Sequence, residues 1–324
     1  MQHRSIENLS VSVVGMGCNQ LGVACDEQGA KALIHEAIDA GINYFDVADE
    51  YGRRYSDPTD PAWGVAEEYL GGALRGKRDR VVVATKFGVR PPTRPELGGA
   101  SAAWIARAAE ESLRRLETDY IDLYQLHIPD PTIPIAETLG ALHELVTAGK
   151  VRVIGCSNLS VAELDEAARV ATELGVEKFA SSQTALNIFS RGALADIMPA
   201  CERLGMSFIP YYPLANGVLT GKYGRDRVPT SGTRLVDQID EATRAKILSE
   251  RTFARIDALE TYARDRGHTL IELAFAWLLA FPAVATVIAG VARPGQASSN
   301  ANASGWQLSR EEADEVVGLV SAAV

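Results

Sequence analysis

INYFDV (residues 42–47), VVVAT (residues 81–85) and IDLYQL (residues 121–126) are apolar runs typical of buried strands, and they begin about forty residues apart. One strand followed by one crossover helix has about this length. A polar side chain stands at or just past the end of each run. These side chains are Asp46, Lys86 and His127. Because parallel strands joined by such crossovers end on the same side of a sheet, we expect the three side chains to meet in space.

The same alternation of strand and helix patterns continues along the chain. Runs rich in Val and Ile predict eight strands, at residues 11–16, 42–47, 81–85, 121–126, 151–155, 179–183, 207–212 and 283–288. Segments with helical periodicity predict helices at residues 27–40, 63–75, 102–116, 133–148, 161–174, 191–204 and 250–281. Strands that are apolar on both faces and alternate with helices indicate a parallel sheet covered by helices.

Eight such units in 324 residues fit a closed (β/α)8 TIM barrel, as a single domain over residues 1–324. The alternative is an open doubly wound sheet. It is disfavoured because no G-x-G-x-x-G turn follows the first predicted strand. Two segments exceed a minimal barrel. One is a long loop after the seventh strand, residues 213–250, whose basic residues could surround an anionic ligand, and the other is an extra C-terminal helix over residues 308–323. Ser309 and Glu312 have the spacing of a capping box at its start.

Composition restricts the partners that the protein can have. The net charge is −10 and no Lys/Arg-rich tract is present, which argues against binding to nucleic acid. No apolar run reaches the roughly 18 residues of a membrane span, and the first residues lack the apolar segment of a secretory signal. We therefore expect a cytoplasmic protein. The cysteines have no metal-binding spacing, so reduced thiols and no metal site are expected at Cys18, Cys25, Cys156 and Cys201.

Tyr51 follows Asp46 in the same predicted strand-to-helix loop, so the cluster would contain an acid, a phenol, an amine and an imidazole. A phenol with a pKa of about 10 donates a proton poorly at neutral pH unless a nearby cation stabilises the phenolate. Lys86 would supply that cation, and Asp46 would hold the ammonium in place. His127 would polarise a carbonyl oxygen through its N–H. Such a set protonates a forming alkoxide, and a hydride cofactor would supply the electron pair.

Each of these residues also has a non-catalytic interpretation. Asp46 could cap a helix or a turn, Lys86 could end a strand in solvent, and His127 could be a core histidine. Their joint placement favours catalysis, because the C-terminal face of a (β/α)8 barrel carries the active site. Asp49 and Glu50, in contrast, are expected to be solvated or to cap the loop.

Five segments resemble the signature segments of the aldo-keto reductase family, in the same order and at matching spacing. They are NYFDVADEYG (43–52), VVVATKFG (81–88), IDLYQLHIPDP (121–131), GKVRVIGCSN (149–158) and YYPLANGVLTGKY (211–223). The resemblance extends from about residue 11 to residue 300. It implies a TIM barrel with the catalytic tetrad Asp46, Tyr51, Lys86 and His127, which is the set that the residues themselves indicate.

The resemblance also implies a binding site for a nicotinamide cofactor. Ser157, Asn158 and Gln183 match positions that hydrogen-bond the carboxamide, and Tyr211 matches the aromatic residue that stacks on the ring. The residues that match the loop over the pyrophosphate are Tyr212, Pro213, Leu214, Asn216 and Lys222, and Arg234 could join them. The residues that match the adenosine-binding turn are Gly290, Arg293, Gln296 and Asn300.

Arg293 makes NADPH the expected cofactor and NADH the less favoured one. Its guanidinium can bind a 2′-phosphate through two hydrogen bonds. Free N–H groups at the start of a helix beside it would favour the same anion. Two residues depart from the family pattern. Ser299 stands where the family often has an acid, and Tyr212 stands where it often has a serine.

The implied activity is reduction of the carbonyl group of an aldehyde or ketone to an alcohol. The partner would be a small-molecule carbonyl compound, and the predicted apolar wall of its pocket is Trp63, Phe87 and Ile128. The loop before Trp63 adds Arg53 and Arg54, which would suit a polar or anionic substrate. The alternative is an NADPH-binding regulatory or redox-sensing subunit with slow turnover, and a metal-dependent aldolase or isomerase barrel is a third hypothesis. The sequence does not specify the oligomeric state.

Overall fold

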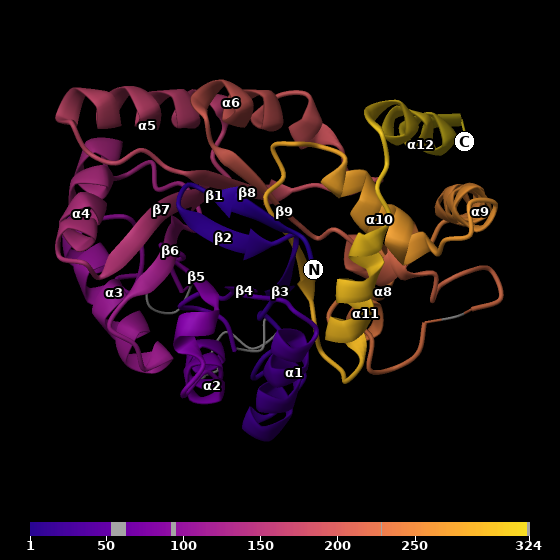
Figure 1. Ribbon diagram of the computed structural model, residues 1–324, viewed down its shortest axis with the longest axis horizontal. Coiled ribbons are helices and arrows are strands. Elements are labelled where there is room, and N and C mark those ends of the chain that lie inside the picture. The colour runs from indigo at the N-terminus through magenta and orange to yellow at the C-terminus, as the bar shows by residue number, and fades with distance from the viewer. Residues whose placement is uncertain (53–62, 92–94, 228, 323–324) are drawn as a thin grey trace.

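The computed structural model describes residues 1–52, 63–91, 95–227 and 229–322. Its centre is a parallel sheet rolled into a barrel (Figure 1). The strands are β3 (Val14–Gly17), β4 (Tyr44–Asp46), β5 (Val82–Phe87), β6 (Ile121–Leu126), β7 (Val151–Ser157), β8 (Ser181–Ala185), β9 (Ser207–Tyr211) and β10 (Val287–Gly290). They follow one another around the sheet in chain order, with β10 beside β3. A bridge between Phe208 and Val284 joins the two ends of the sheet, which confirms the predicted (β/α)8 barrel.

Helices alternate with the strands and cover the outside of the barrel (Figure 1). They are α1 (Glu27–Asp39), α2 (Val65–Ala73), α3 (Ala102–Leu116), α4 (Ile135–Thr147), α5 (Val161–Leu174), α6 (Ile197–Leu204), α9 (Glu250–Arg264), α10 (Leu270–Leu279), α11 (Gln296–Asn302) and α12 (Arg310–Ala322). The predicted bounds of α3 and α5 match the structure. Both helices begin after a serine, Ser101 or Ser160, whose side chain accepts a backbone N–H of the first turn. The predicted capping box of Ser309 and Glu312 is also present, at the start of α12.

Several predicted segments differ from the structure. The predicted helix over residues 191–204 is η2 (Gly192–Leu194) followed by α6, and the predicted strand over residues 283–288 is β10, which begins at Val287. The predicted strand over residues 11–16 is divided, because β1 (His3–Ile6) and β2 (Leu9–Ser12) form an antiparallel hairpin before β3 begins. The predicted helix over residues 250–281 is two helices, α9 and α10, with Gly267 between them at a φ of 79°. The loop after β9 contains the short helices η3 (Ala215–Thr220), α7 (Arg234–Asp237) and α8 (Glu241–Ile247).

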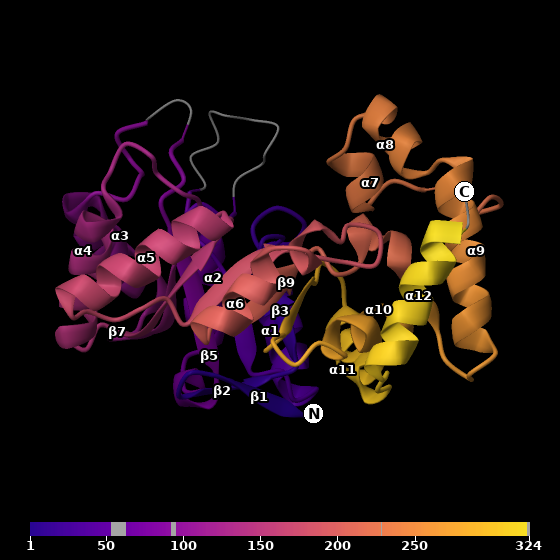
Figure 2. The ribbon, with the colours of Figure 1, turned by 90° about the horizontal axis from the view of Figure 1, so that it is seen from above.

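The β1–β2 hairpin covers the amino-terminal end of the barrel. Figure 2 shows it at the opposite end of the molecule from α7 and α8. Ile6, Leu9 and Val11 are buried in a core cluster with inward-facing residues of the barrel strands, such as Tyr44 and Leu123. Burial of these apolar side chains fixes the hairpin in place. The carboxyl ends of the strands, at the other end of the barrel, carry the predicted site residues.

Arg4 connects the hairpin to the last part of the barrel. Its guanidinium donates hydrogen bonds to three backbone carbonyls at and beyond the end of α10. These belong to Leu279 at 2.7 Å, Phe281 at 3.1 Å and Val284 at 2.5 Å. The charged group thereby satisfies carbonyls that have no partner at a helix end.

The four cysteines are free thiols, and Cys18, Cys156 and Cys201 are buried. Within the described ranges, no group of three or more His, Cys, Asp and Glu side chains could hold a metal ion. No helix in the part of the chain that the structure describes is long and apolar enough to cross a membrane.

Candidate active site

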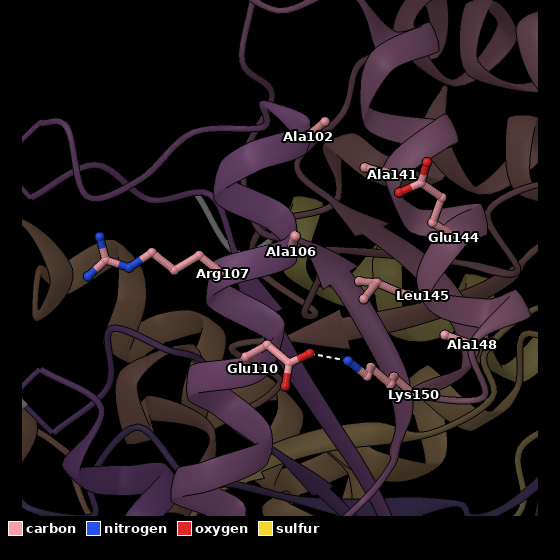
Figure 3. Close-up of a pocket in the computed structure, with 9 residues that line it drawn as sticks. All are labelled: Ala102, Ala106, Arg107, Glu110, Ala141, Glu144, Leu145, Ala148 and Lys150. Atoms are coloured by element: carbon pink, nitrogen blue, oxygen red, sulfur yellow. Dashed lines mark hydrogen bonds and ion pairs between the residues drawn. The ribbon is translucent and has the colours of Figure 1, made fainter.

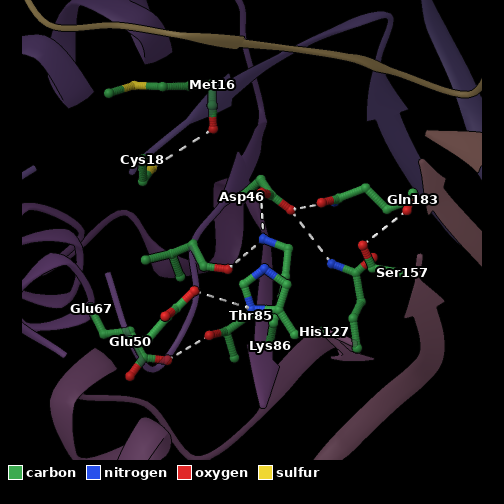
Figure 4. Close-up of polar contacts among 12 residues, drawn as sticks. Met16, Cys18, Asp46, Glu50, Glu67, Thr85, Lys86, His127, Ser157 and Gln183 are labelled. Carbon is green, nitrogen blue, oxygen red and sulfur yellow. Dashed lines mark hydrogen bonds and ion pairs between the residues drawn. The ribbon is translucent and has the colours of Figure 1, made fainter. Parts of the chain in front are cut away.

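Asp46, at the end of β4, is the centre of a buried polar cluster (Figure 4). Its Oδ1 accepts a hydrogen bond from Lys86 Nζ at 2.5 Å, and its Oδ2 accepts one from Gln183 Nε2 at 2.8 Å. Gln125 Nε2 lies at 3.5 Å from the same Oδ2. Lys86 is fully buried and also donates to the Val47 carbonyl at 2.9 Å. The Asp46 carboxylate therefore balances an ammonium that has no contact with bulk water.

Tyr51 and His127 complete this cluster. Lys86 Nζ lies 5.0 Å from the centroid of the Tyr51 ring. That ring meets the His127 ring edge-on, with 5.8 Å between centroids and an angle of 78°. The backbone N–H of His127 donates to the Phe87 carbonyl at 2.9 Å, which ties the segment after β6 to the end of β5. The structure thus brings together the four side chains that the sequence predicted to meet.

His127 is a neutral imidazole at neutral pH. Burial lowers its pKa well below the ordinary value, and the charge of Lys86 lowers it further. The nearest carboxylate is that of Glu50, whose Oε1 lies 3.8 Å from Nδ1, beyond hydrogen-bonding distance (Figure 4). A neutral ring carries one N–H, which can be donated to a carbonyl oxygen.

The residues predicted to hold a nicotinamide form a chain of hydrogen bonds beside His127. Tyr211 donates its hydroxyl to Asn158 Oδ1 at 2.8 Å. Asn158 Nδ2 donates to Ser157 Oγ at 2.9 Å and to the His127 carbonyl at 3.1 Å. Ser157 Oγ donates to the Gln183 carbonyl at 2.9 Å. Because the side-chain amide of Gln183 is bound to Asp46, Gln183 joins the two groups of residues.

The predicted pyrophosphate loop is held by a contact between Tyr212 and Arg234. Tyr212 has a φ of 55° and is 43% exposed. Arg234 donates to its hydroxyl at 2.8 Å, and the guanidinium carbon lies 4.6 Å from the ring centroid. Among the other predicted residues, Pro213 is buried, Leu214 and Asn216 are half-buried and Lys222 is exposed.

Two other basic residues of this loop are paired with acids. Arg225 forms ion pairs with Glu250 and Asp257 on α9, and Arg227 forms one with Glu260 at 3.1 Å. These guanidinium groups anchor the loop to α9. Of the basic residues predicted to surround an anion, Lys222 and Arg234 are therefore better placed than Arg225 and Arg227.

The predicted adenosine-binding turn follows β10. Arg293 donates to the Gly232 carbonyl, so it links this turn to the loop after β9. Gln296 Oε1 accepts the backbone N–H groups of Ala292 at 2.8 Å and Arg293 at 3.0 Å. Gly290, at the end of β10, is exposed, whereas Asn300 is buried.

Glu36, on α1, binds the start of α11. Its carboxylate accepts the N–H groups of Gly295 at 2.8 Å and Ser298 at 2.9 Å. Burial raises the pKa of Glu36, but the hydrogen bonds from Ser298 and Gly295 outweigh this and lower it overall, which favours the carboxylate. Two N–H groups that the sequence predicted to be free for a phosphate are therefore already bound to an anion.

Two residues of the loop after β4 are more buried than the sequence predicted. Asp49 and Glu50 are only 2% and 7% exposed, so the expectation that they are solvated is wrong. The Asp49 N–H donates to the Lys86 carbonyl at 3.1 Å, and this bond draws the loop into the barrel wall. Among the described residues, neither oxygen of the Asp49 side chain has a hydrogen-bond partner. Burial raises the pKa of Asp49 well above its ordinary value, and the neighbouring Glu67 carboxylate adds to the shift.

This raised pKa predicts how Asp49 affects stability. Between the ordinary pKa of about 4 and the raised pKa of the folded protein, the carboxyl is ionised in the unfolded chain but protonated in the folded one, so its contribution to stability falls as pH rises through this range. We expect Asp49→Asn to remove this loss of unfolding free energy, which grows by about 1.4 kcal/mol per pH unit between the pKa values of the unfolded and folded states. Urea unfolding of both proteins from pH 4 to pH 7 measures it. Parallel pH profiles for the two proteins would contradict the prediction.

Sequence reasoning missed several buried polar residues around the tetrad. Gln125 lies in β6, two residues before His127, which follows the end of the strand, and this spacing of two was the available signal. Glu67, Thr85 and Arg115 are also buried and linked to one another. No spacing rule connects these three residues.

The predicted substrate wall is only partly accessible. Ile128 is 38% exposed and Trp63 is half-buried. Phe87 is fully buried and packs against Tyr124, with 4.7 Å between ring centroids. A ligand could touch Ile128 directly, whereas Phe87 lies below the surface. Arg53 and Arg54 lie outside the described residues.

A separate hollow of about 440 Å³ lies on the outer surface, between α3 and α4 (Figure 3). Small side chains such as Ala106 and Ala141 line it, and the ion pair of Glu110 and Lys150 crosses one end. None of its lining residues belongs to the predicted site. The hollow is therefore separate from the predicted active site.

Comparison with known proteins shows the family of the chain. The model of the aldo/keto reductase family matches residues 13–321. The chain belongs to the aldo/keto reductase family. Membership and fold together support a carbonyl-reducing oxidoreductase that uses a nicotinamide cofactor.

Individual relatives align with almost the whole chain. Aldo-keto reductase YhdN of Bacillus subtilis (strain 168) is 31% identical, over 98% of this chain and 92% of its own length. A probable voltage-gated potassium channel subunit beta of Oryza sativa subsp. japonica is also 31% identical, over 94% and 91%. Among solved structures, a glycerol dehydrogenase from Gluconobacter oxydans superposes with a TM-score of 0.82 at 29% identity, over 99% of this chain and 96% of the other.

Proposed function

We propose that the protein reduces an aldehyde or ketone to an alcohol, with NADPH as hydride donor and Tyr51 as proton donor. The observation that carries this proposal is the buried ammonium of Lys86, which is paired with Asp46 at 2.5 Å and lies 5.0 Å from the Tyr51 ring centroid. A cation in this place stabilises the phenolate that remains when Tyr51 gives up its proton. Neutral His127 would donate its N–H to the carbonyl oxygen and hold it for that transfer.

The residues present fit a nicotinamide. Ser157 and Asn158 offer a hydroxyl and an amide for its carboxamide, and Tyr211 offers a half-buried aromatic ring for its face. When bound, the cofactor would supply the hydride to the carbonyl carbon. Tyr51 would give its proton to the carbonyl oxygen, and Lys86 would stabilise the phenolate until a solvent proton replaces the one transferred.

The preference for NADPH is proposed to depend on Arg293. The Glu36 carboxylate opposes a phosphate near α11, so a 2′-phosphate would rely on this guanidinium. We expect Arg293→Ala to weaken NADPH binding about 10-fold or more and to leave NADH binding unchanged. Quenching of protein fluorescence by each nucleotide measures the two dissociation constants. An unchanged ratio of the two dissociation constants would show that Arg293 does not determine the preference for NADPH.

The substrate is proposed to be a small carbonyl compound that enters between the loops carrying Trp63 and Ile128, above the buried Phe87. Three buried free thiols suit a reducing compartment, and we place the protein in the cytoplasm. The decisive experiment is a panel of aldehydes, ketones and sugars, each assayed by loss of the absorbance of reduced nicotinamide. No oxidation of NADPH or NADH with any carbonyl would reject the proposed activity.

A second candidate function follows from the names of the relatives. Two plant proteins that match over 94% of the chain are described as probable voltage-gated potassium channel beta subunits. A regulatory subunit would bind NADPH with the same residues and turn over slowly. Tight NADPH binding together with negligible oxidation across the whole carbonyl panel would favour this function over the first.

A further inference from the structure

Behind the tetrad, on the outer side of β5, lies a second buried ion pair. Arg115 on α3 donates from Nε to Glu67 Oε2 on α2 at 2.7 Å. The two side chains are 5% and 0% exposed. Thr85 on β5 donates its hydroxyl to the other carboxylate oxygen, Oε1, at 2.5 Å. Both Glu67 oxygens are therefore bound, and one carboxylate joins two helices and a strand of the barrel.

This pair touches the two segments that carry the catalytic groups. Thr85 precedes Lys86 directly in β5, so its side chain points out of the barrel while Lys86 points in. Figure 4 shows Thr85 and Glu67 in contact beside Lys86. On the other segment, the Ala66 N–H donates to the Tyr51 carbonyl at 3.2 Å, so the loop of Tyr51 is hydrogen-bonded to the turn of α2 that contains Glu67.

Arg115 also lies directly against the start of α2. A β-carbon on Gly64 would be 2.6 Å from Arg115 Nε, which shows how closely the backbone packs on the guanidinium. Gly64 has a φ of 83° and precedes the first residue of α2. The position of α2 is therefore set by contact with Arg115 on one side and by the bond from Glu67 to Thr85 on the other.

We propose that the Glu67–Arg115 ion pair, which is hydrogen-bonded to β5 through Thr85, fixes the position of the Tyr51 phenol relative to the Lys86 ammonium. The inference rests on the proposed function, because it concerns the proton donor named there. The three side chains do not face the barrel interior, so they act through Tyr51 and Lys86 and are positioning residues. Buried, fully hydrogen-bonded charges are suited to this, because any shift of α2 would leave a charge unpaired.

Thr85→Val tests whether the Glu67–Arg115 pair positions Tyr51, with Thr85→Ser as the matched control. Valine keeps the shape of threonine and removes the hydroxyl, whereas serine keeps the hydroxyl and removes a methyl group. We expect Thr85→Val to lower kcat about 10- to 100-fold, because a misplacement of about 1 Å has an effect of this size. Thr85→Ser should stay within about threefold of the wild type, and the dissociation constant of NADPH should change less than about twofold in both.

A second readout does not depend on turnover. The absorbance of tyrosinate is measured as a function of pH in each variant and in the same variant with Tyr51→Phe added. The difference between the two curves gives the titration of Tyr51 alone. We expect the midpoint of this titration to rise by about half a pH unit or more in Thr85→Val, because the phenolate loses contact with the ammonium, and to stay unchanged in Thr85→Ser. Thermal unfolding checks that each variant is folded. If Thr85→Val does not fold, Arg115→Lys replaces it, because lysine keeps the charge but loses the planar fork beside Gly64.

Wild-type kcat and an unshifted midpoint in a folded Thr85→Val would overturn the inference. Equal losses in Thr85→Val and Thr85→Ser would also overturn it, because the hydroxyl would then not be the cause. A different result, full turnover in Tyr51→Phe, would reject the proposed function. The titration of Tyr51 would still show whether the Glu67–Arg115 pair positions this residue.

Discussion

Replacement of Tyr51 by phenylalanine is expected to lower kcat by a factor of about 10² to 10⁴, the range of a lost general acid. Phenylalanine keeps the ring that meets His127 edge-on and lies beside Lys86, and it removes the hydroxyl that carries the proton. Binding of NADPH should be nearly unchanged. Single-turnover kinetics with saturating cofactor and a substrate from the carbonyl panel measure the loss at the chemical step.

Tyr211→Phe is the matched control for this experiment. It also removes one phenolic hydroxyl, the one that donates to Asn158. We expect weaker NADPH binding and a kcat that falls far less than in Tyr51→Phe, since Tyr211 gives no proton to the carbonyl in the proposed mechanism. Wild-type turnover in Tyr51→Phe, or equal losses of kcat in the two variants, would reject Tyr51 as the proton donor.

Replacement of Lys86 by methionine should damage both activity and stability. Lys86 is fully buried and its ammonium pairs with Asp46, which is 4% exposed. Removal of one partner of a buried pair leaves the other charge uncompensated and costs about 3–5 kcal/mol of unfolding free energy. Turnover should fall about as far as in Tyr51→Phe, because the phenolate loses its cation.

The double variant Lys86→Met/Asp46→Asn separates these two effects. It removes the unpaired carboxylate, so we expect it to regain much of the lost unfolding free energy and none of the lost turnover. Urea unfolding and the carbonyl assay measure the two quantities on the same samples. A Lys86→Met protein as stable as the wild type, or a double variant with restored turnover, would contradict the roles assigned to the pair.

Local patterns predicted the barrel and the meeting of Asp46, Lys86 and His127, because both depend on regular spacing. The three residues stand at or just past the ends of strands that succeed one another around the sheet, so equal intervals in the chain become one cluster in space. Helical periodicity predicted the bounds of α3 and α5, and the structure shows that a serine caps the start of each. In these cases a single rule of local geometry fixes the outcome.

The parts that sequence reasoning missed depend on packing between distant elements. The bond from Gln183 to Asp46 spans 137 positions, and that from Arg115 to Glu67 spans 48, and no periodicity relates either pair. The N-terminal hairpin was missed for a different reason. Its turn uses Glu7 with a φ of 52° where glycine is the usual signal. The apolar run from Val11 also continues into β3 without a break in composition.

The bonds of Arg4 have a consequence for synthesis of the chain. Its carbonyl partners lie 275 to 280 positions later, so at about 5–20 residues per second they are made roughly 14–55 seconds after it. Throughout that interval the hairpin has no closed barrel to cover, and Ile6, Leu9 and Val11 lack part of their final surroundings. Translation that stops before residue 284 therefore leaves a nascent chain whose hairpin has no closed barrel to cover.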